Sequence, residues 1–120
     1  HKGFEYSRTK NPTRLAYENC LASIECGSHG FAFASGCAAT STILHMLQAG
    51  DQVVSGDDLY GGSLRIFERV FKQMGVQFIY ADTTDIKNVT KVLSKKTKMV
   101  WLETPTNPLL KISDIAAISK

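Results

Sequence analysis

Three predicted strands in this chain are each followed by polar or glycine-rich residues that could bind a ligand. The strands cover residues 31–34, 52–55 and 99–102, and they are followed by Ser35-Gly36-Cys37, by Asp57 to Gly62 and by Glu103 to Asn107. These segments offer an aromatic ring at Tyr60, a carboxylate at Glu103 and an amide at Asn107. Together with backbone N–H groups, such a set suits a flat, phosphorylated, hydrogen-bonding aromatic cofactor.

The segment Ser35-Gly36-Cys37 has the composition of a phosphate-binding turn. It lies between a predicted strand at 31–34 and a predicted helix over 38–47, and the first N–H groups of a helix have no partner within it. Gly36 would let a phosphate approach closely, and Ser35 could donate its hydroxyl. Glycine turns of this kind also occur where nothing binds, so a ligand site here depends on what the other segments place beside it.

The intervening residues predict alternating helices and strands. Asn11 caps a helix with Pro12 at its first position, which Gly27 ends, and Ser63 caps a second helix that ends at Gly75. Further strands are predicted at 52–55, 76–81 and 99–102, and further helices over about 86–93 and from Ser113-Asp114 onward. This alternation is typical of an α/β fold with a parallel sheet wrapped by helices, in which ligands bind beyond the carboxyl ends of the strands.

Composition favours an ordinary globular unit. The chain has 120 residues, 43% of them hydrophobic and 21% charged, and a net charge of +3, and its one lysine cluster (Lys91, Lys95, Lys96 and Lys98) is typical of a solvated helix end. Nothing resembles a nucleic-acid footprint, a membrane span or a signal peptide, so we expect a cytoplasmic protein with neither nucleic acid nor membrane as partner. Three cysteines without Cys-x-x-Cys or histidine spacing predict reduced thiols and no metal site.

Four motifs closely resemble those of the pyridoxal-phosphate enzymes of transsulfuration. They are Tyr6-Ser7-Arg8 with Asn11-Pro12-Thr13, Ala34-Ser35-Gly36, Tyr60-Gly61-Gly62 with Arg65, and Glu103-Thr104-Pro105-Thr106-Asn107-Pro108. They follow the family's order and extend over nearly the whole chain. The resemblance implies pyridoxal 5'-phosphate as cofactor and a three-layer α/β/α large domain with a mostly parallel sheet. Residues 1–11 would form an N-terminal arm, and residues 12–120 the N-terminal part of that cofactor-binding domain.

The resemblance also implies roles for single residues at the cofactor. Gly36 and Cys37 would give backbone N–H groups to the phosphate. Tyr60 would stack on the pyridine ring and move protons, whereas without the flanking motifs it would be a surface aromatic. Asn107 would hydrogen-bond the ring oxygen, with Glu103 supporting it from nearby; the alternative is a polar strand end.

A second group of implied roles concerns the neighbouring subunit and the substrate. Tyr6 and Arg8 would reach the cofactor phosphate of a neighbouring subunit, in a homotetramer built from two dimers with shared active sites. Arg65 matches a position that contacts substrate, although an exposed helix arginine is a simpler account of it.

The implied activity is that of a carbon–sulfur lyase of methionine and cysteine metabolism. We expect γ-elimination of cystathionine to cysteine, 2-oxobutanoate and ammonia; the alternatives are γ-replacement on an activated homoserine ester, β-elimination, methionine γ-elimination, or a cofactor- or phosphate-binding module without catalysis. None of the lysines stands in the Ser-x-Thr-Lys setting that the family's Schiff-base lysine occupies, so these residues alone should not catalyse. A dinucleotide-binding domain would need Gly-x-Gly-x-x-Gly and a hydrolase Gly-x-Ser-x-Gly, and the chain has neither.

Overall fold

A computed structural model of the chain describes residues 3–120, so the first two residues of the predicted arm lie outside it. The chain divides into two compact units, residues 1–39 and residues 40–120, and each is described by itself. No helix within the described residues is both long enough and apolar enough to cross a membrane.

The first unit is built on helix α1, Pro12–Ile24. Its start is the predicted one: the side chain of Asn11 accepts a hydrogen bond from the backbone N–H of Arg14 at 3.1 Å, and proline occupies the first turn. The guanidinium of Arg14 then reaches back to donate to the carbonyl oxygens of Ser7 at 3.2 Å and Thr9 at 3.1 Å. The residues before α1 therefore form a turn that is held by the helix.

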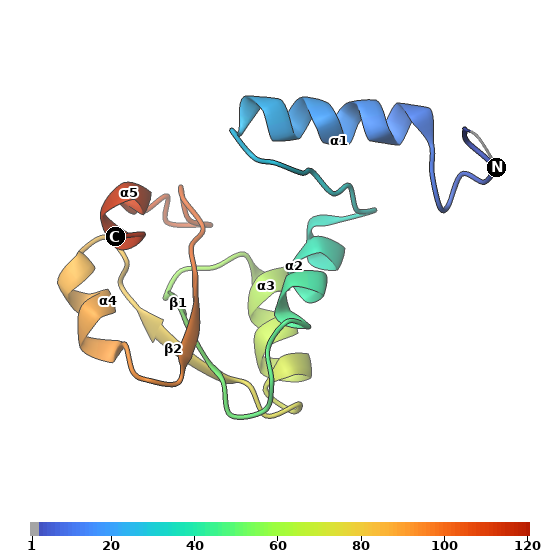
Figure 1. Ribbon diagram of the computed structural model, residues 1–120. Helices are drawn as coiled ribbons and strands as arrows, with labels where there is room; N and C mark the ends of the chain where they lie inside the picture. The colour runs from blue at the N-terminus through green and yellow to red at the C-terminus, as the bar shows by residue number, and fades with distance from the viewer. Residues whose placement is uncertain (1–2) are drawn as a thin grey trace. The chain divides into compact units, whose positions relative to one another are not determined.

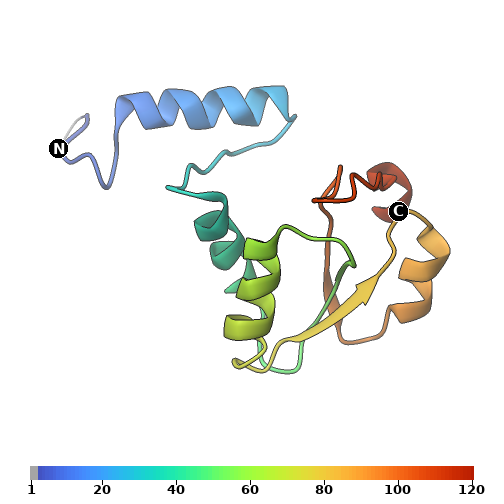
Figure 2. The same cartoon turned by 180° about the vertical axis from the view of Figure 1, so that it is seen from behind.

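The chain leaving α1 runs back beside the helix, as Figures 1 and 2 show. The backbone N–H of Ala32 donates to the Glu18 carboxylate at 2.9 Å, and a Cβ atom at Gly30 would lie 2.3 Å from the carbonyl oxygen of Glu18. The strand predicted at 31–34 is wrong, because these residues form neither strand nor helix. A short apolar run makes a strand only where another strand pairs with it, and here Glu18 of α1 accepts the backbone N–H of Ala32 instead.

Helix α2, Gly36–Leu44, begins directly after this segment. The hydroxyl oxygen of Ser35 accepts the backbone N–H of Ala38 at 3.1 Å, so this serine acts as the helix cap. The helix starts two residues earlier than the predicted span, and it ends before His45.

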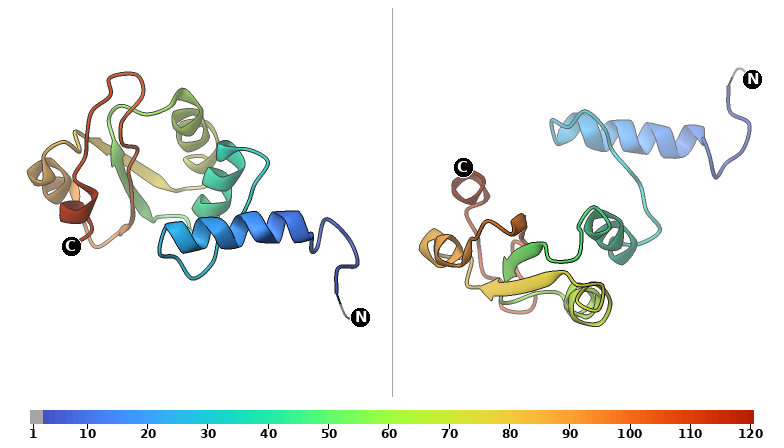
Figure 3. Two further views of the ribbon diagram at one scale, coloured as in Figure 1. Left: turned by 90° about the horizontal axis from the view of Figure 1, so that it is seen from above. Right: turned by 60° about the horizontal axis from the view of Figure 1, so that its bottom comes forward.

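The second unit contains a three-stranded parallel sheet in the order β2-β1-β3, formed by β1 (Gln52–Gly56), β2 (Gln77–Ala81) and β3 (Thr97–Trp101). From β1 to β2 and from β2 to β3 the chain moves in opposite directions across the sheet. Right-handed crossovers then place the two connecting helices on opposite faces. Figure 3 shows α3 (Gly61–Ile66) and α4 (Ile86–Val92) on different sides of the strands, which confirms the predicted α/β fold.

The core of this unit lies on the face covered by α3. Five buried side chains form it, contributed by α2, β1, the helix after β1 and the residue before β2: Leu44, Val53, Phe67, Phe71 and Val76. The ring of Phe67 stacks on Phe78 with centroids 4.6 Å apart and meets Trp101 edge-on at 5.8 Å. On the other face α4 contacts β2 and buries Val89, and the short helix α5, Ile115–Ile118, contacts α4.

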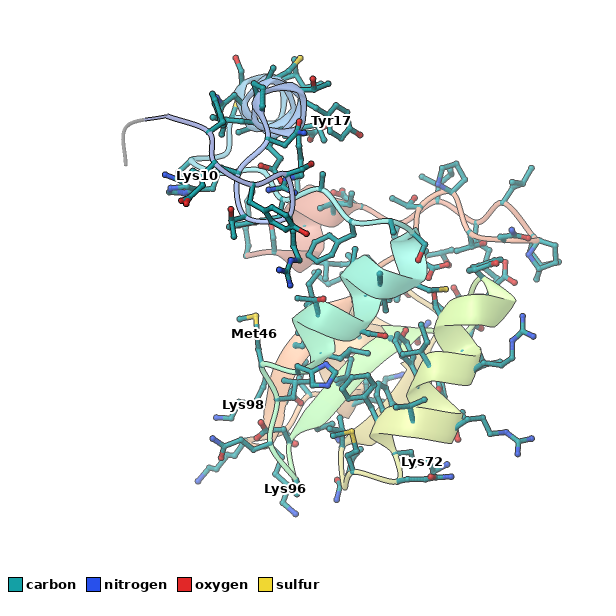
Figure 4. All side chains as sticks on the ribbon, turned by 90° about the vertical axis from the view of Figure 1, so that its right-hand side faces the viewer. Lys10, Tyr17, Met46, Lys72, Lys96 and Lys98 are labelled. Carbon is teal, nitrogen blue, oxygen red and sulfur yellow. The ribbon has the colours of Figure 1, made fainter. Side chains whose placement is uncertain are left out.

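The helix after β1 differs from its prediction at its start and in its middle. It begins at Gly61, and Ser63 lies inside its first turn, so Ser63 is not the cap that the sequence predicts. After α3 it widens into one π turn, Phe67–Phe71, which ends next to the exposed Lys72 that Figure 4 labels. The lysine cluster at the end of α4 is exposed as expected, with Lys96 and Lys98 pointing away from the ribbon in Figure 4.

Candidate functional site

The loops that follow β1 and β3 are joined at the carboxyl edge of the sheet. Asp58, with only 8% of its surface exposed, accepts hydrogen bonds on one carboxylate oxygen from the hydroxyl of Thr106 and from the backbone N–H of Leu109, the latter at 2.9 Å. The Thr106 hydroxyl oxygen in turn accepts the backbone N–H of Lys111 at 2.8 Å. Two of the three predicted ligand-binding segments therefore lie together at this edge of the sheet, which we call the rim.

Lys111 also ties the end of β2 to this rim. Its Nζ lies 2.9 and 3.0 Å from the two carboxylate oxygens of Asp57 and 3.4 Å from Asp82. The hydrogen bond to Asp57, together with Asp82, raises the pKa of Lys111. Hydrogen bonds from the hydroxyl and N–H of Thr84, together with Lys111, lower the pKa of Asp82. Lys111, in the loop after β3, thus pairs with carboxylates that follow β1 and β2.

Glu103, at the end of β3, holds the start of α3. One of its carboxylate oxygens accepts the backbone N–H of Tyr60 at 2.8 Å. The other accepts the hydroxyl of Ser63 at 2.6 Å and the indole N–H of Trp101 at 3.3 Å. Asn107 is not among its contacts, and both carboxylate oxygens are occupied by donors of this chain.

The ring of Tyr60 rests on the backbone of Gly62. A Cβ atom at position 62 would lie 2.3 Å from Cε1 of the ring, so only glycine accommodates this ring position. The side chain is nevertheless 51% exposed, which leaves much of the ring open to a ligand. A flat aromatic surface is therefore presented at the rim, supported from below by the chain itself.

Asn107 and Arg65 are exposed on the same unit. Thr106, the residue before Asn107, donates its hydroxyl to Asp58, which lies two residues before Tyr60. The Asn107 amide therefore belongs to the joined rim. Within the described residues that amide has no hydrogen-bond partner. The Arg65 Nε donates to the carbonyl oxygen of Gly61 at 3.0 Å, which folds this side chain against its own helix.

The remaining predicted site residues belong to the first unit. Gly36 and Cys37 open α2, next to the capping Ser35, and their contact with a phosphate stays a prediction. Tyr6 is exposed, and the guanidinium carbon of Arg8 lies 5.1 Å from the centroid of its ring. The role of these two residues at a neighbouring subunit also stays a prediction.

Sequence reasoning missed the polar residues that build the rim, namely Asp58, Thr106 and Lys111. A signal existed in the doubled aspartate at a strand end and in a threonine between two prolines. The sequence does not show which of these residues pair, because Thr106 and Asp58, like Lys111 and Asp57, are about fifty positions apart.

The donor set of the rim fits a planar, hydrogen-bonding cofactor such as pyridoxal phosphate. The Tyr60 ring seated on Gly62 offers a stacking surface. The Asn107 amide, which has no partner among residues 3–120, offers a hydrogen bond at the edge of the cofactor ring. Neither feature is needed to complete the core of this unit, which lies beneath α3.

Comparison with known proteins identifies relatives over the whole chain. A family model described as Cys/Met metabolism PLP-dependent enzyme matches residues 1–120. The chain is 57% identical to a cystathionine beta-lyase of Coxiella burnetii, covering 100% of this chain and 31% of that protein. It is 50% identical to a probable cystathionine gamma-synthase of Herpetosiphon aurantiacus, covering 100% of this chain and 38% of that protein.

Solved structures give the same result. A cystathionine gamma-lyase from Lactobacillus plantarum, complexed with L-serine, superimposes with a TM-score of 0.93 at 50% identity, covering 98% of this chain and 31% of that one. The metB protein from Corynebacterium glutamicum superimposes with a TM-score of 0.94 at 43% identity over the same shares. The chain therefore spans about a third of the length of these relatives.

Proposed function

This chain belongs to the family of pyridoxal-phosphate-dependent enzymes of cysteine and methionine metabolism, and we propose that the complete protein cleaves cystathionine. The proposed reaction is γ-elimination, in which cystathionine and water give cysteine, 2-oxobutanoate and ammonia. The observation that carries the proposal is the exposed Tyr60 ring, seated on Gly62 and held at its backbone by Glu103. Likeness to the Lactobacillus plantarum cystathionine gamma-lyase supports the choice of reaction.

The proposed cofactor contacts are those that the sequence motifs imply. Tyr60 stacks on the pyridine ring, Asn107 donates its amide hydrogen to the ring oxygen, and the N–H groups of Gly36 and Cys37 bind the phosphate. When bound, pyridoxal phosphate supplies an electron sink for negative charge on the substrate's α-carbon. The phenol of Tyr60 then stands where it can accept or return a proton.

Residues outside these contacts complete the proposal. Tyr6 and Arg8 bind the cofactor phosphate of a neighbouring subunit, in a cytoplasmic homotetramer with shared active sites. Arg65 contacts the substrate once its hydrogen bond to the Gly61 carbonyl oxygen is broken. The cofactor-binding lysine is expected in the part of the longer relatives that this chain does not cover, since none of its own lysines lies in the family's setting.

A second candidate reaction is β-elimination, which is favoured by the 57% identity to the Coxiella burnetii cystathionine beta-lyase. The two reactions cut different carbon–sulfur bonds of one substrate. With water, β-elimination gives homocysteine, pyruvate and ammonia, whereas γ-elimination gives cysteine, 2-oxobutanoate and ammonia.

Product analysis tests the proposal. The complete protein, loaded with pyridoxal phosphate, is incubated with cystathionine and, separately, with an activated homoserine ester plus cysteine. We expect 2-oxobutanoate and cysteine from the first mixture. Pyruvate and homocysteine would assign β-elimination, and cystathionine formed in the second mixture would assign a γ-synthase.

Tyr60→Phe measures the contribution of the phenol. We expect turnover to fall by about 10²-fold or more, as for loss of an acid–base group, with unchanged thermal unfolding of the protein without cofactor. Arg69→Lys, an exposed conservative change on the same helix, is the control. Equal turnover in Tyr60→Phe and wild type would show that the Tyr60 phenol does not transfer a proton in the reaction.

A further inference from the structure

We propose that Glu103 is a positioning residue that presets the Tyr60 ring for the cofactor before the cofactor binds. The proposal deepens the proposed function and rests on it, because the ring must face pyridoxal phosphate for its placement to matter. Glu103 itself need not touch cofactor or substrate.

The donors around Glu103 match the acceptor oxygens of a carboxylate. Three donors face it, namely the backbone N–H of Tyr60, the hydroxyl of Ser63 and the indole N–H of Trp101. An ionised carboxylate only accepts hydrogen bonds, so it can satisfy all three. A glutamine of the same shape would turn its NH₂ group toward one of these donors and leave that donor unpaired.

Glu103 contacts the main chain of Tyr60, and the position of the main chain limits where the ring can lie. Tyr60 is the residue immediately before α3, and its own side chain makes no cap to the helix. Its N–H is held by Glu103, which is 43 positions away in the chain and lies two residues after the end of β3. With the backbone fixed at this point and the ring seated on Gly62, two independent contacts determine where the ring lies.

This arrangement gives Glu103 a role in cofactor affinity. A ring that is already placed loses little conformational freedom when a ligand stacks on it, so less of the stacking energy is spent on ordering. Loosening the Tyr60 backbone should therefore weaken cofactor binding even though the ring itself is unchanged.

A double-mutant cycle tests the proposal in the complete protein. The dissociation constant of pyridoxal phosphate is measured by absorbance titration of the cofactor-free forms of wild type, Glu103→Gln, Tyr60→Ala and the double variant. We expect Glu103→Gln to weaken binding about tenfold when Tyr60 is present, the factor expected for a hydrogen bond to a charged group, and less than twofold when Tyr60 is absent. An equal loss in both backgrounds would overturn the positioning role.

Ser63→Ala is the matched control, because it removes one donor from the same carboxylate and leaves the contact with Tyr60. It should change the dissociation constant less than threefold. A loss as large as that of Glu103→Gln would show that the whole cluster, rather than the Tyr60 contact, matters, and would count against the proposal.

A second variant covers the case in which Glu103→Gln does not fold. Glu103→Asp keeps the charge but shortens the side chain, and the same cycle with Tyr60→Ala applies to it. Thermal unfolding of each cofactor-free variant identifies the folded ones. If wild type binds no pyridoxal phosphate, the proposed function fails; if wild type binds and the losses are equal in both backgrounds, only the role of Glu103 fails.

Discussion

The two units of this chain are ordered by different means. In residues 40–120 five apolar side chains form a closed core and the strand ends are joined by polar contacts. Among residues 3–39 no side chain is buried, and Ile24 and Phe31 are 67% and 74% exposed. The first unit is held by local polar contacts such as the Asn11 cap, each of which contributes about 1 kcal/mol.

This difference indicates where each unit obtains its stability. Burial of large apolar side chains is the main favourable term in folding, and the second unit has it within its own residues. The apolar surface of the first unit remains uncovered within the described chain. It suits the proposal that Tyr6 and Arg8 of this unit reach a neighbouring subunit.

The largest expected effect is the difference in unfolding free energy between a variant in the core of the second unit and a variant on α1. Phe67→Ala should lower the free energy of unfolding of the complete protein by about 3–5 kcal/mol, because it removes a fully buried ring that contacts two other aromatic rings. The measurement is urea-induced unfolding followed by tryptophan fluorescence.

Ile24→Ala is the paired variant, since Ile24 is exposed within the described chain. In the complete protein, measured as a monomer, it should change the free energy of unfolding by less than about 0.5 kcal/mol. A loss as large as that of Phe67→Ala would show that the first unit has an apolar core of its own.

A smaller effect is expected at the joined rim. Asp58→Ala leaves the Thr106 hydroxyl and the Leu109 N–H without their acceptor, which should cost about 1–3 kcal/mol of unfolding free energy. Asp57→Ala, at the neighbouring exposed residue, should cost clearly less. Equal values for the two variants would mean that the loops are not held through the buried carboxylate.

The smallest effect is a dependence on pH. Because hydrogen bonds lower the pKa of Asp82 in the folded protein, the unfolded chain binds this proton more readily. The stability that Asp82 contributes is complete above the ordinary aspartate pKa of about 3.9 and is lost as the pH falls through the lower folded value. Asp82→Asn should therefore flatten the fall of the melting temperature below about pH 4, and an unchanged slope would contradict the hydrogen-bonding account.

Local signals in the sequence predicted the elements that depend on local contacts. The start of α1 was predictable because the cap, Asn11, and the proline at the first position act within one turn. The strands β1, β2 and β3 were predictable from short apolar runs between turn residues, each within two residues of its observed span.

Elements that depend on distant partners were not predictable in the same way. Residues 31–34 resemble a strand but have no strand to pair with. Ser63 has the composition of a cap, yet Glu103, forty positions away, takes its hydroxyl. In the same way the motifs pointed to Tyr60, Glu103 and Asn107. The contact of Glu103 with Tyr60 and the pairing of Asp58 with Thr106 became visible only in the structure.

The outer strands of the sheet have a consequence for handling this segment in isolation. Within residues 3–120 β2 and β3 each pair on one side only, so each leaves a row of backbone donors and acceptors open. Such an edge is a template for strands of other molecules, and β3 carries the apolar run Met99-Val100-Trp101. Lys98 is the one charged side chain on that strand, and expression of residues 1–120 alone should accordingly yield aggregates that a further lysine on β3 would reduce.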